Sequence, residues 1–178
     1  SEVEDLERRA REVNKRIKDL IDRLRERVRK IEEDIRRLNK ELKEEVDKII
    51  EEIRKDGGEN REEVRRLEEE IKKKIEESNR DVERVIKEIR EKIRELKKRA
   101  DDLSEESKRK IEEVRRVRDG KLIEELLREH EKMLKEIEDR IRKIERELDE
   151  LLKTLEDKHR EILDELEKEL RKAKERRR

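Results

Sequence analysis

Cysteine, proline and aromatic residues are all missing from this chain of 178 residues. Without cysteine, a disulfide framework, a thiolate metal site and a cysteine nucleophile are excluded. Without aromatic side chains, the chain has no surface on which bases could stack, and its core has to be built from aliphatic residues. The absence of proline removes the residue that most strongly breaks helices. These absences together favour long, uninterrupted helices.

The charges are numerous but balanced. Basic and acidic residues number 57 each, charged residues make up 64% of the chain, and apolar residues make up only 28%. A disordered chain usually carries a net charge, whereas a balanced excess of Glu, Lys and Arg beside Leu and Ile is typical of long helices. No apolar run is long enough for a membrane span or a signal peptide. We therefore expect a soluble protein with no nucleic-acid or membrane partner, compatible with cytoplasmic expression, although the sequence indicates no cellular location.

Glycine occurs only at Gly57, Gly58 and Gly120, and these positions divide the chain into three segments of similar length. We expect a glycine in each turn to adopt the left-handed conformation that ends a helix, and Asn60 to cap the second helix. Connections this short make neighbouring helices antiparallel. The predicted bounds are helices over about 2–56, 60–118 and 121–176, with turns at 57–59 and 119–120.

The apolar residues repeat with one period in all three segments. From Val3 to Ile53, from Val64 to Val114 and from Ile123 to Ala173, fourteen steps cover fifty residues, which is about 3.57 residues per step. This value lies between the 3.5 of a left-handed supercoil and the 3.6 of a straight helix. The pattern predicts an all-α fold: a single domain over 1–178, forming an elongated, antiparallel up-down-up three-helix bundle that is nearly straight to weakly left-handed.

Several local features resemble those of computationally designed helical bundles. Ser1 with Glu4 forms a capping-box pattern at the first residue, the Asp-Gly connections are minimal, and the core is free of aromatic residues. Natural three-helix repeats of the spectrin type are the nearest alternative, but they resemble shorter units with tryptophan in the core. The resemblance implies a structural scaffold with no natural biochemical activity.

Four polar residues interrupt the apolar face: Ser78 and Ser107 in the second segment, His130 and His159 in the third. In an antiparallel pair, residues at the same height have residue numbers with a constant total, which is about 238 for a turn at Gly120. Ser107 with His130 fits this total, and so does Ser78 with His159. Each histidine is therefore predicted to lie beside a serine in the core.

Two asparagines are candidates to complete these layers. A turn centred on the first two glycines gives a total of about 117 for the first two helices, which places Asn39 level with Ser78 and His159. The second layer fits less closely, because Asn14 lies about one helical turn from the height of Ser107. The predicted layers are Asn39/Ser78/His159 and Asn14/Ser107/His130. Asn79 and Ser104 are possible additional members.

These layers are interpreted as a structural hydrogen-bond network that sets helix register, because buried polar groups that lack partners destabilise a core. The alternative is a pH-responsive switch. Buried neutral imidazoles at His130 and His159 resist protonation, so their pKa values would be lowered and acid would destabilise the fold. The spacing alone does not separate these two interpretations.

Other functions find little support. The two histidines are about 43 Å apart along one helix, and no Cys, Asp or Glu shares their inward face one turn away, so we expect no metal site and no cofactor. A core sealed from solvent lacks a pocket and an oxyanion hole, so we expect no catalytic residue and no enzyme. We expect a monomer that needs no partner. The alternative is a bundle that opens to pair with another helix or copy, through widened apolar stretches such as Ile49/Ile50.

Overall fold

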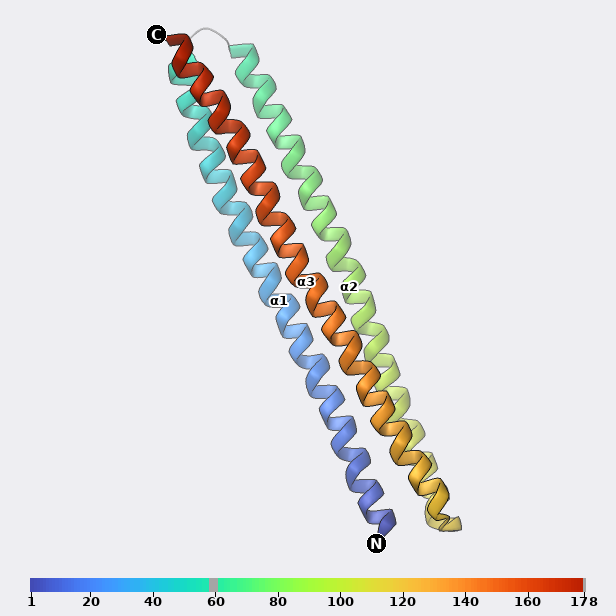
Figure 1. Ribbon diagram of the computed structural model, residues 1–178. Helices are drawn as coiled ribbons and strands as arrows, with labels where there is room; N and C mark the ends of the chain where they lie inside the picture. The colour runs from blue at the N-terminus through green and yellow to red at the C-terminus, as the bar shows by residue number, and fades with distance from the viewer. Residues whose placement is uncertain (58–60, 178) are drawn as a thin grey trace. The chain divides into compact units, whose positions relative to one another are not determined.

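The computed structural model describes residues 1–57 and 61–177, which form three α-helices (Figure 1). Helix α1 covers Glu2–Gly57, α2 covers Arg61–Val117 and α3 covers Gly120–Arg177. No strand occurs in this part of the chain. The helix bounds agree with the prediction to within one residue, which confirms the all-α class. The predicted turn residue Gly58 and the predicted cap Asn60 lie outside the described residues.

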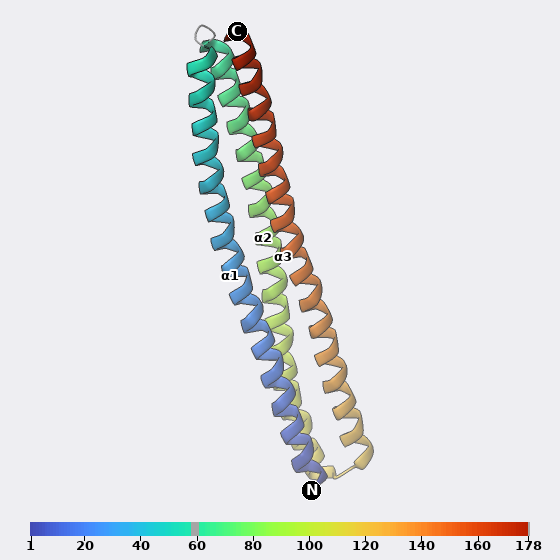
Figure 2. The same cartoon turned by 60° about the vertical axis from the view of Figure 1, so that its left-hand side comes forward.

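The contacts divide the chain into two compact units, each containing part of all three helices. The first unit comprises Ser1–Val28 and Lys87–Glu147, and the second comprises Arg29–Ile86 and Leu148–Arg178. Figure 2 gives another view of the three helices and of the short connection from α2 to α3. The single domain predicted for the whole chain stays a prediction.

Ion pairs between helices show the direction of packing inside each unit. In the first unit, Lys110 pairs with Glu129 at 3.0 Å and Lys92 pairs with Glu147 at 3.1 Å, so α2 and α3 are antiparallel. Between α1 and α3 the residue numbers rise together, as parallel helices require: Arg9 with Glu131 and Arg27 with Glu145. In the second unit α2 and α3 are again antiparallel, with the pairs Lys74–Glu165 and Arg176–Glu63. The predicted three-helix bundle is confirmed.

The core of each unit is aliphatic. In the first unit, Leu6 and Val114 are fully buried and pack with Ile123 and Leu126, so all three helices contribute. Burying each such side chain contributes about 1.5–3 kcal/mol, more than any exposed ion pair. The second unit has a longer cluster of the same kind: Leu42, Val46, Ile50, Ile53, Val64, Ile71, Ile162, Leu166 and Ala173. Hydrophobic packing of the predicted faces therefore holds both units together.

Two predicted core positions are shifted by one residue. Steps of about 3.57 residues counted from Val3 and from Ile123 place Ile49 and Leu152 inside, whereas the structure buries Ile50 and Leu151 and leaves the predicted pair half-buried. In both places two adjacent apolar residues compete for the core, and a fixed step cannot decide between neighbours about 100° apart on the helix. Packing against the facing helices therefore determines which of the two neighbours is buried.

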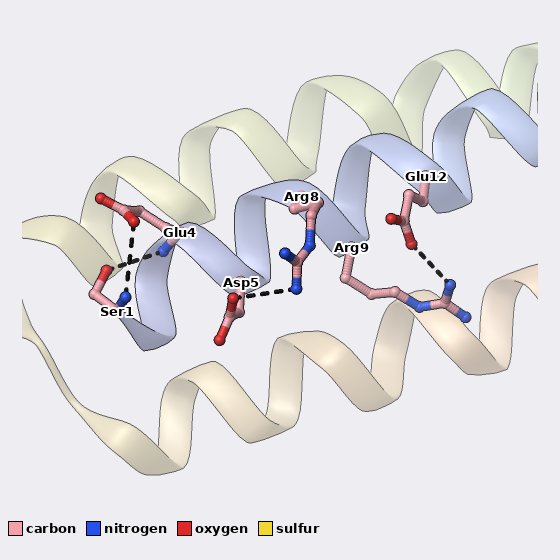
Figure 3. A network of polar contacts seen from close by, with 6 residues as sticks. All are labelled: Ser1, Glu4, Asp5, Arg8, Arg9 and Glu12. Carbon is pink, nitrogen blue, oxygen red and sulfur yellow. Dashed lines mark hydrogen bonds and ion pairs between the residues drawn. The ribbon is translucent and has the colours of Figure 1, made fainter.

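The start of α1 has the predicted cap (Figure 3). The Glu4 backbone N–H donates a hydrogen bond to Oγ of Ser1 at 3.3 Å, and the Glu4 carboxylate lies 3.7 Å from the Ser1 amine. This is the reciprocal arrangement of a capping box. The view also shows two exposed ion pairs, Arg8 with Asp5 and Arg9 with Glu12, which contribute at most a few tenths of a kcal/mol each. The cap, rather than these pairs, sets the helix start.

The connection between α2 and α3 differs from the prediction. Arg118, not Gly120, has the left-handed conformation, with φ of 49°. Its N–H donates to the Val114 carbonyl at 2.7 Å, which closes the last turn of α2. Asp119 then caps α3, because its Oδ1 accepts a hydrogen bond from the Lys121 N–H at 3.1 Å. Gly120 is thus the first residue of α3 and not the left-handed turn residue, because the aspartate cap at Asp119 starts the helix immediately before it.

Candidate functional site

Ser107 and His130 form a buried hydrogen-bonded pair in the core of the first unit. Their side chains are 3% and 2% exposed, and the Ser107 hydroxyl contacts Nε2 of the His130 ring. On its other side, the ring donates from Nδ1 to the backbone carbonyl of Leu126 at 2.7 Å. The predicted pairing of these two residues across α2 and α3 is therefore confirmed.

The Leu126 carbonyl determines which ring nitrogen carries the proton. A carbonyl oxygen only accepts, so Nδ1 must carry hydrogen. In the neutral ring Nε2 then has a lone pair, and the Ser107 hydroxyl donates to it. Sequence spacing did not reveal the Leu126 contact, although a residue four positions earlier on a helix is within reach of a buried histidine. The ring is held by two partners, one on each nitrogen.

Asn14 lies near this pair but is not part of the same hydrogen-bond chain. It lines a hollow together with Ser104 and Ser107, which confirms that α1 brings it to the height of the pair. Its Oδ1 is buried without a hydrogen-bond partner, so it accepts no hydrogen bond from Ser107. A buried acceptor in this state costs about 1–3 kcal/mol. Two of the three predicted members of this layer are joined.

The register between α1 and α2 explains why Asn14 lies closer to the height of Ser107 than predicted. In the pairs Arg115–Glu7 and Arg54–Glu68, one in each unit, the residue numbers add to about 122 rather than the predicted 117. The helix ends differ from the predicted ones by only one residue each, so the packing of α1 against α2, not the position of their ends, sets this register. By this register Asn14 is level with Ser107, and Asn39 is about one helical turn from the level of Ser78.

The second predicted layer lies in the second unit. Ser78 and His159 are both buried, at 7% and 8% exposure, as the pattern predicted. The Oδ1 of Asn39 is buried without a partner, so it accepts no hydrogen bond from either residue, consistent with the shifted register. A hydrogen bond between Ser78 and His159 stays a prediction. Ser78 and His159 are therefore confirmed as buried positions, whereas the Asn39 oxygen is not joined to them.

Burial lowers the pKa of His159 below its ordinary value, because the core does not solvate an imidazolium ion. The negative charge of Glu156, three residues earlier, opposes this effect only in part. The sequence prediction of a lowered pKa is therefore confirmed for His159. At neutral pH this histidine is an uncharged core residue.

The hollow beside Ser107 has a volume of about 440 Å³ and lies between α1 and α2 of the first unit. A second hollow of about 560 Å³ shares Asn14 and Ser104 with it. Small side chains explain the space, since Ala10, Ser104 and Ser107 line the first hollow where large aliphatic residues would fill it. Ser107 lines the hollow while it and His130 stay buried, so the hollow reaches the edge of the pair and not the histidine ring.

No family model matches the chain, and neither a curated protein nor a solved structure matches it significantly. Within residues 1–57 and 61–177, no group of three or more His, Cys, Asp or Glu side chains is placed to hold a metal ion. In the same part of the chain, no helix has an apolar stretch long enough to cross a membrane. The Ser107–His130 pair and its hollow are the strongest candidate site.

Proposed function

We propose that this chain is a computationally designed structural scaffold, a monomeric helical bundle whose buried Ser/His pairs determine helix register. The observation that carries the proposal is the Ser107–His130 hydrogen bond inside an otherwise aliphatic core. An all-aliphatic interface can slide by one turn at little cost, whereas sliding would leave both polar groups unpaired. The absence of aromatic residues and of similar proteins is consistent with this origin.

The surface supports the monomeric part of the proposal. Among the described residues, the only large apolar side chain that is exposed is Val117, at 63%. A partner helix needs a continuous apolar face, and one valine does not supply it. Light scattering tests this point: a mass of 22.2 kDa at all concentrations is expected, and a mass that rises with concentration would contradict it.

Register is tested by cross-linking. Lys110 and Glu129 face each other across α2 and α3, so a cysteine pair at these positions reports the native register. A second pair, Lys110→Cys with Glu125→Cys, reports a slip of about one turn. When Ser107 and His130 are both replaced by leucine, the slipped disulfide is expected to become detectable. If only the native disulfide forms in both backgrounds, the polar pair does not determine register.

A pH-responsive switch is the second candidate, and the lowered pKa of His159 favours it. Acid would charge the unfolded chain before it charges the buried ring, which destabilises the fold. In this alternative the histidines are responsive elements, whereas in the scaffold proposal their acid sensitivity is a by-product of burial. The unfolding free energies at pH 7 and pH 5, compared between the unchanged chain and His159→Gln, measure the size of the effect.

A further inference from the structure

Ser107 combines two properties that together suggest chemical reactivity. Its hydroxyl is hydrogen-bonded to an imidazole, and its side chain lines a hollow of about 440 Å³. We propose that Ser107 is a nucleophile toward small activated carboxylic esters that enter this hollow, with His130 as its general base. This reactivity goes beyond the scaffold role and does not depend on how the chain arose.

The hydrogen bonds of the pair match what nucleophile activation needs. A serine hydroxyl is a weak nucleophile unless a base takes its proton, and the base must itself be oriented by a third group. Nε2 of His130 contacts the Ser107 hydroxyl, and Nδ1 is held by the Leu126 carbonyl at 2.7 Å. The carbonyl fixes the tautomer in which Nε2 accepts the proton. Ser107, His130 and Leu126 therefore supply the nucleophile, the base and the orienting group.

Charged side chains of both signs line the hollow, the carboxylates of Glu7 and Glu112 among them, and its cations can serve the developing oxyanion. Arg11 and Lys108 line it, and neither forms an ion pair among the described residues, whereas Arg115 at the edge pairs with Glu7. A cation beside the carbonyl oxygen stabilises the tetrahedral intermediate more than the neutral ester, which lowers the barrier. Because both cations are at the end of flexible side chains, they can approach a bound ester without strain.

The reaction balances with water as the only co-reactant. The Ser107 oxygen bonds to the acyl carbon as its proton passes to Nε2 of His130. The tetrahedral intermediate then breaks its bond to the leaving alcohol or phenol, which takes the proton from Nε2, and acyl-Ser107 remains. Water next gives a proton to Nε2 as it attacks the acyl carbon, and the released Ser107 oxygen recovers that proton. The products are a carboxylic acid and an alcohol.

The size of the hollow limits the substrate. A volume of about 440 Å³ is at the lower end of the range for small-molecule sites. It accommodates a short acyl chain with one aromatic leaving group. Activated phenyl esters are expected to react first, because they need the least help with the leaving group.

The experiment uses the full chain and p-nitrophenyl acetate. We expect acetylation of Ser107, located by peptide mass spectrometry, together with release of p-nitrophenolate. The variants Ser107→Ala and His130→Gln should lose this modification, and their rate of p-nitrophenolate release should fall by roughly 100-fold or more. The matched controls are Ser78→Ala and His159→Gln, which change the equivalent positions of the second unit and should react as the unchanged chain does. Circular dichroism of each variant verifies that the bundle is folded.

The mapping on the unchanged chain needs no variant and decides the proposal even if a variant unfolds. Acetyl groups found only on lysines or on the terminal amine would overturn it. Equal rates for the unchanged chain and folded Ser107→Ala or His130→Gln would also overturn it. The scaffold proposal is judged separately by cross-linking, so a failure here leaves the register result standing.

Discussion

Ser107 donates its hydroxyl hydrogen to Nε2 of His130 across α2 and α3, so the removal of either side chain leaves the atom that faced it unpaired in the core. This dependence allows the pair to specify a register, and it also makes the pair vulnerable to single substitutions. An unpaired buried group loses its full hydration, whereas two apolar replacements lose none.

Ser107→Ala is expected to destabilise the chain by about 1–3 kcal/mol, because Nε2 of His130 then has no donor. Adding His130→Leu in the same chain should recover most of this loss, because the replacement is apolar and similar in size. Urea unfolding of the two variants measures both effects. An additive loss in the double variant would mean that the pair is not coupled.

Asn14→Leu is expected to stabilise the first unit by roughly 1 kcal/mol or more. The substitution removes a buried oxygen that has no partner, and the adjoining hollow has room for the leucine. Asn79→Leu is the matched control, because Asn79 is half-buried and contains no unpaired buried oxygen, so its effect should be smaller. Thermal unfolding gives the comparison. A loss of stability in Asn14→Leu would show that the amide has a necessary partner.

Arg118→Gly is expected to stabilise the connection between α2 and α3 by about 1 kcal/mol. A residue with a Cβ at φ of 49° is strained, and glycine is not. Gly120→Ala should add about 0.4–1 kcal/mol, because residue 120 is helical and an added Cβ meets no atom within 4 Å. Denaturant midpoints of the two variants test both statements. If Arg118→Gly lowers the midpoint, the left-handed turn does not form in solution.

Acid is expected to destabilise the chain through His159. Its folded pKa is lowered, so the stabilising effect of the neutral ring is complete above the unfolded value of about 6.5 and is lost as pH falls through the folded pKa. The change in unfolding free energy between pH 7 and pH 5 should be smaller in His159→Gln than in the unchanged chain. Equal losses in the two proteins would assign the acid sensitivity to other groups.

Much of the candidate site could be predicted without coordinates. Ser107 and His130 were paired correctly because a short turn at Asp119 and Gly120 leaves little freedom in how α2 and α3 align. Asn39 was misplaced because side-chain packing sets the register of α1 against α2, and the pairs Arg115–Glu7 and Arg54–Glu68 give a total of about 122 rather than 117. A difference of about five in this total moves a side chain by roughly one helical turn along its partner.

The amino-acid sequence by itself determined the three helices, the faces that they bury and the pairing of serine with histidine, since these depend on period and turn length alone. Only the tertiary structure decided that Leu126 orients His130, that Asn14 and Asn39 have unpaired oxygens, that Arg118 is the left-handed residue, and that a hollow opens beside Ser107. These features depend on how closely side chains from different helices fill the space between them. Spacing along one helix does not contain that information.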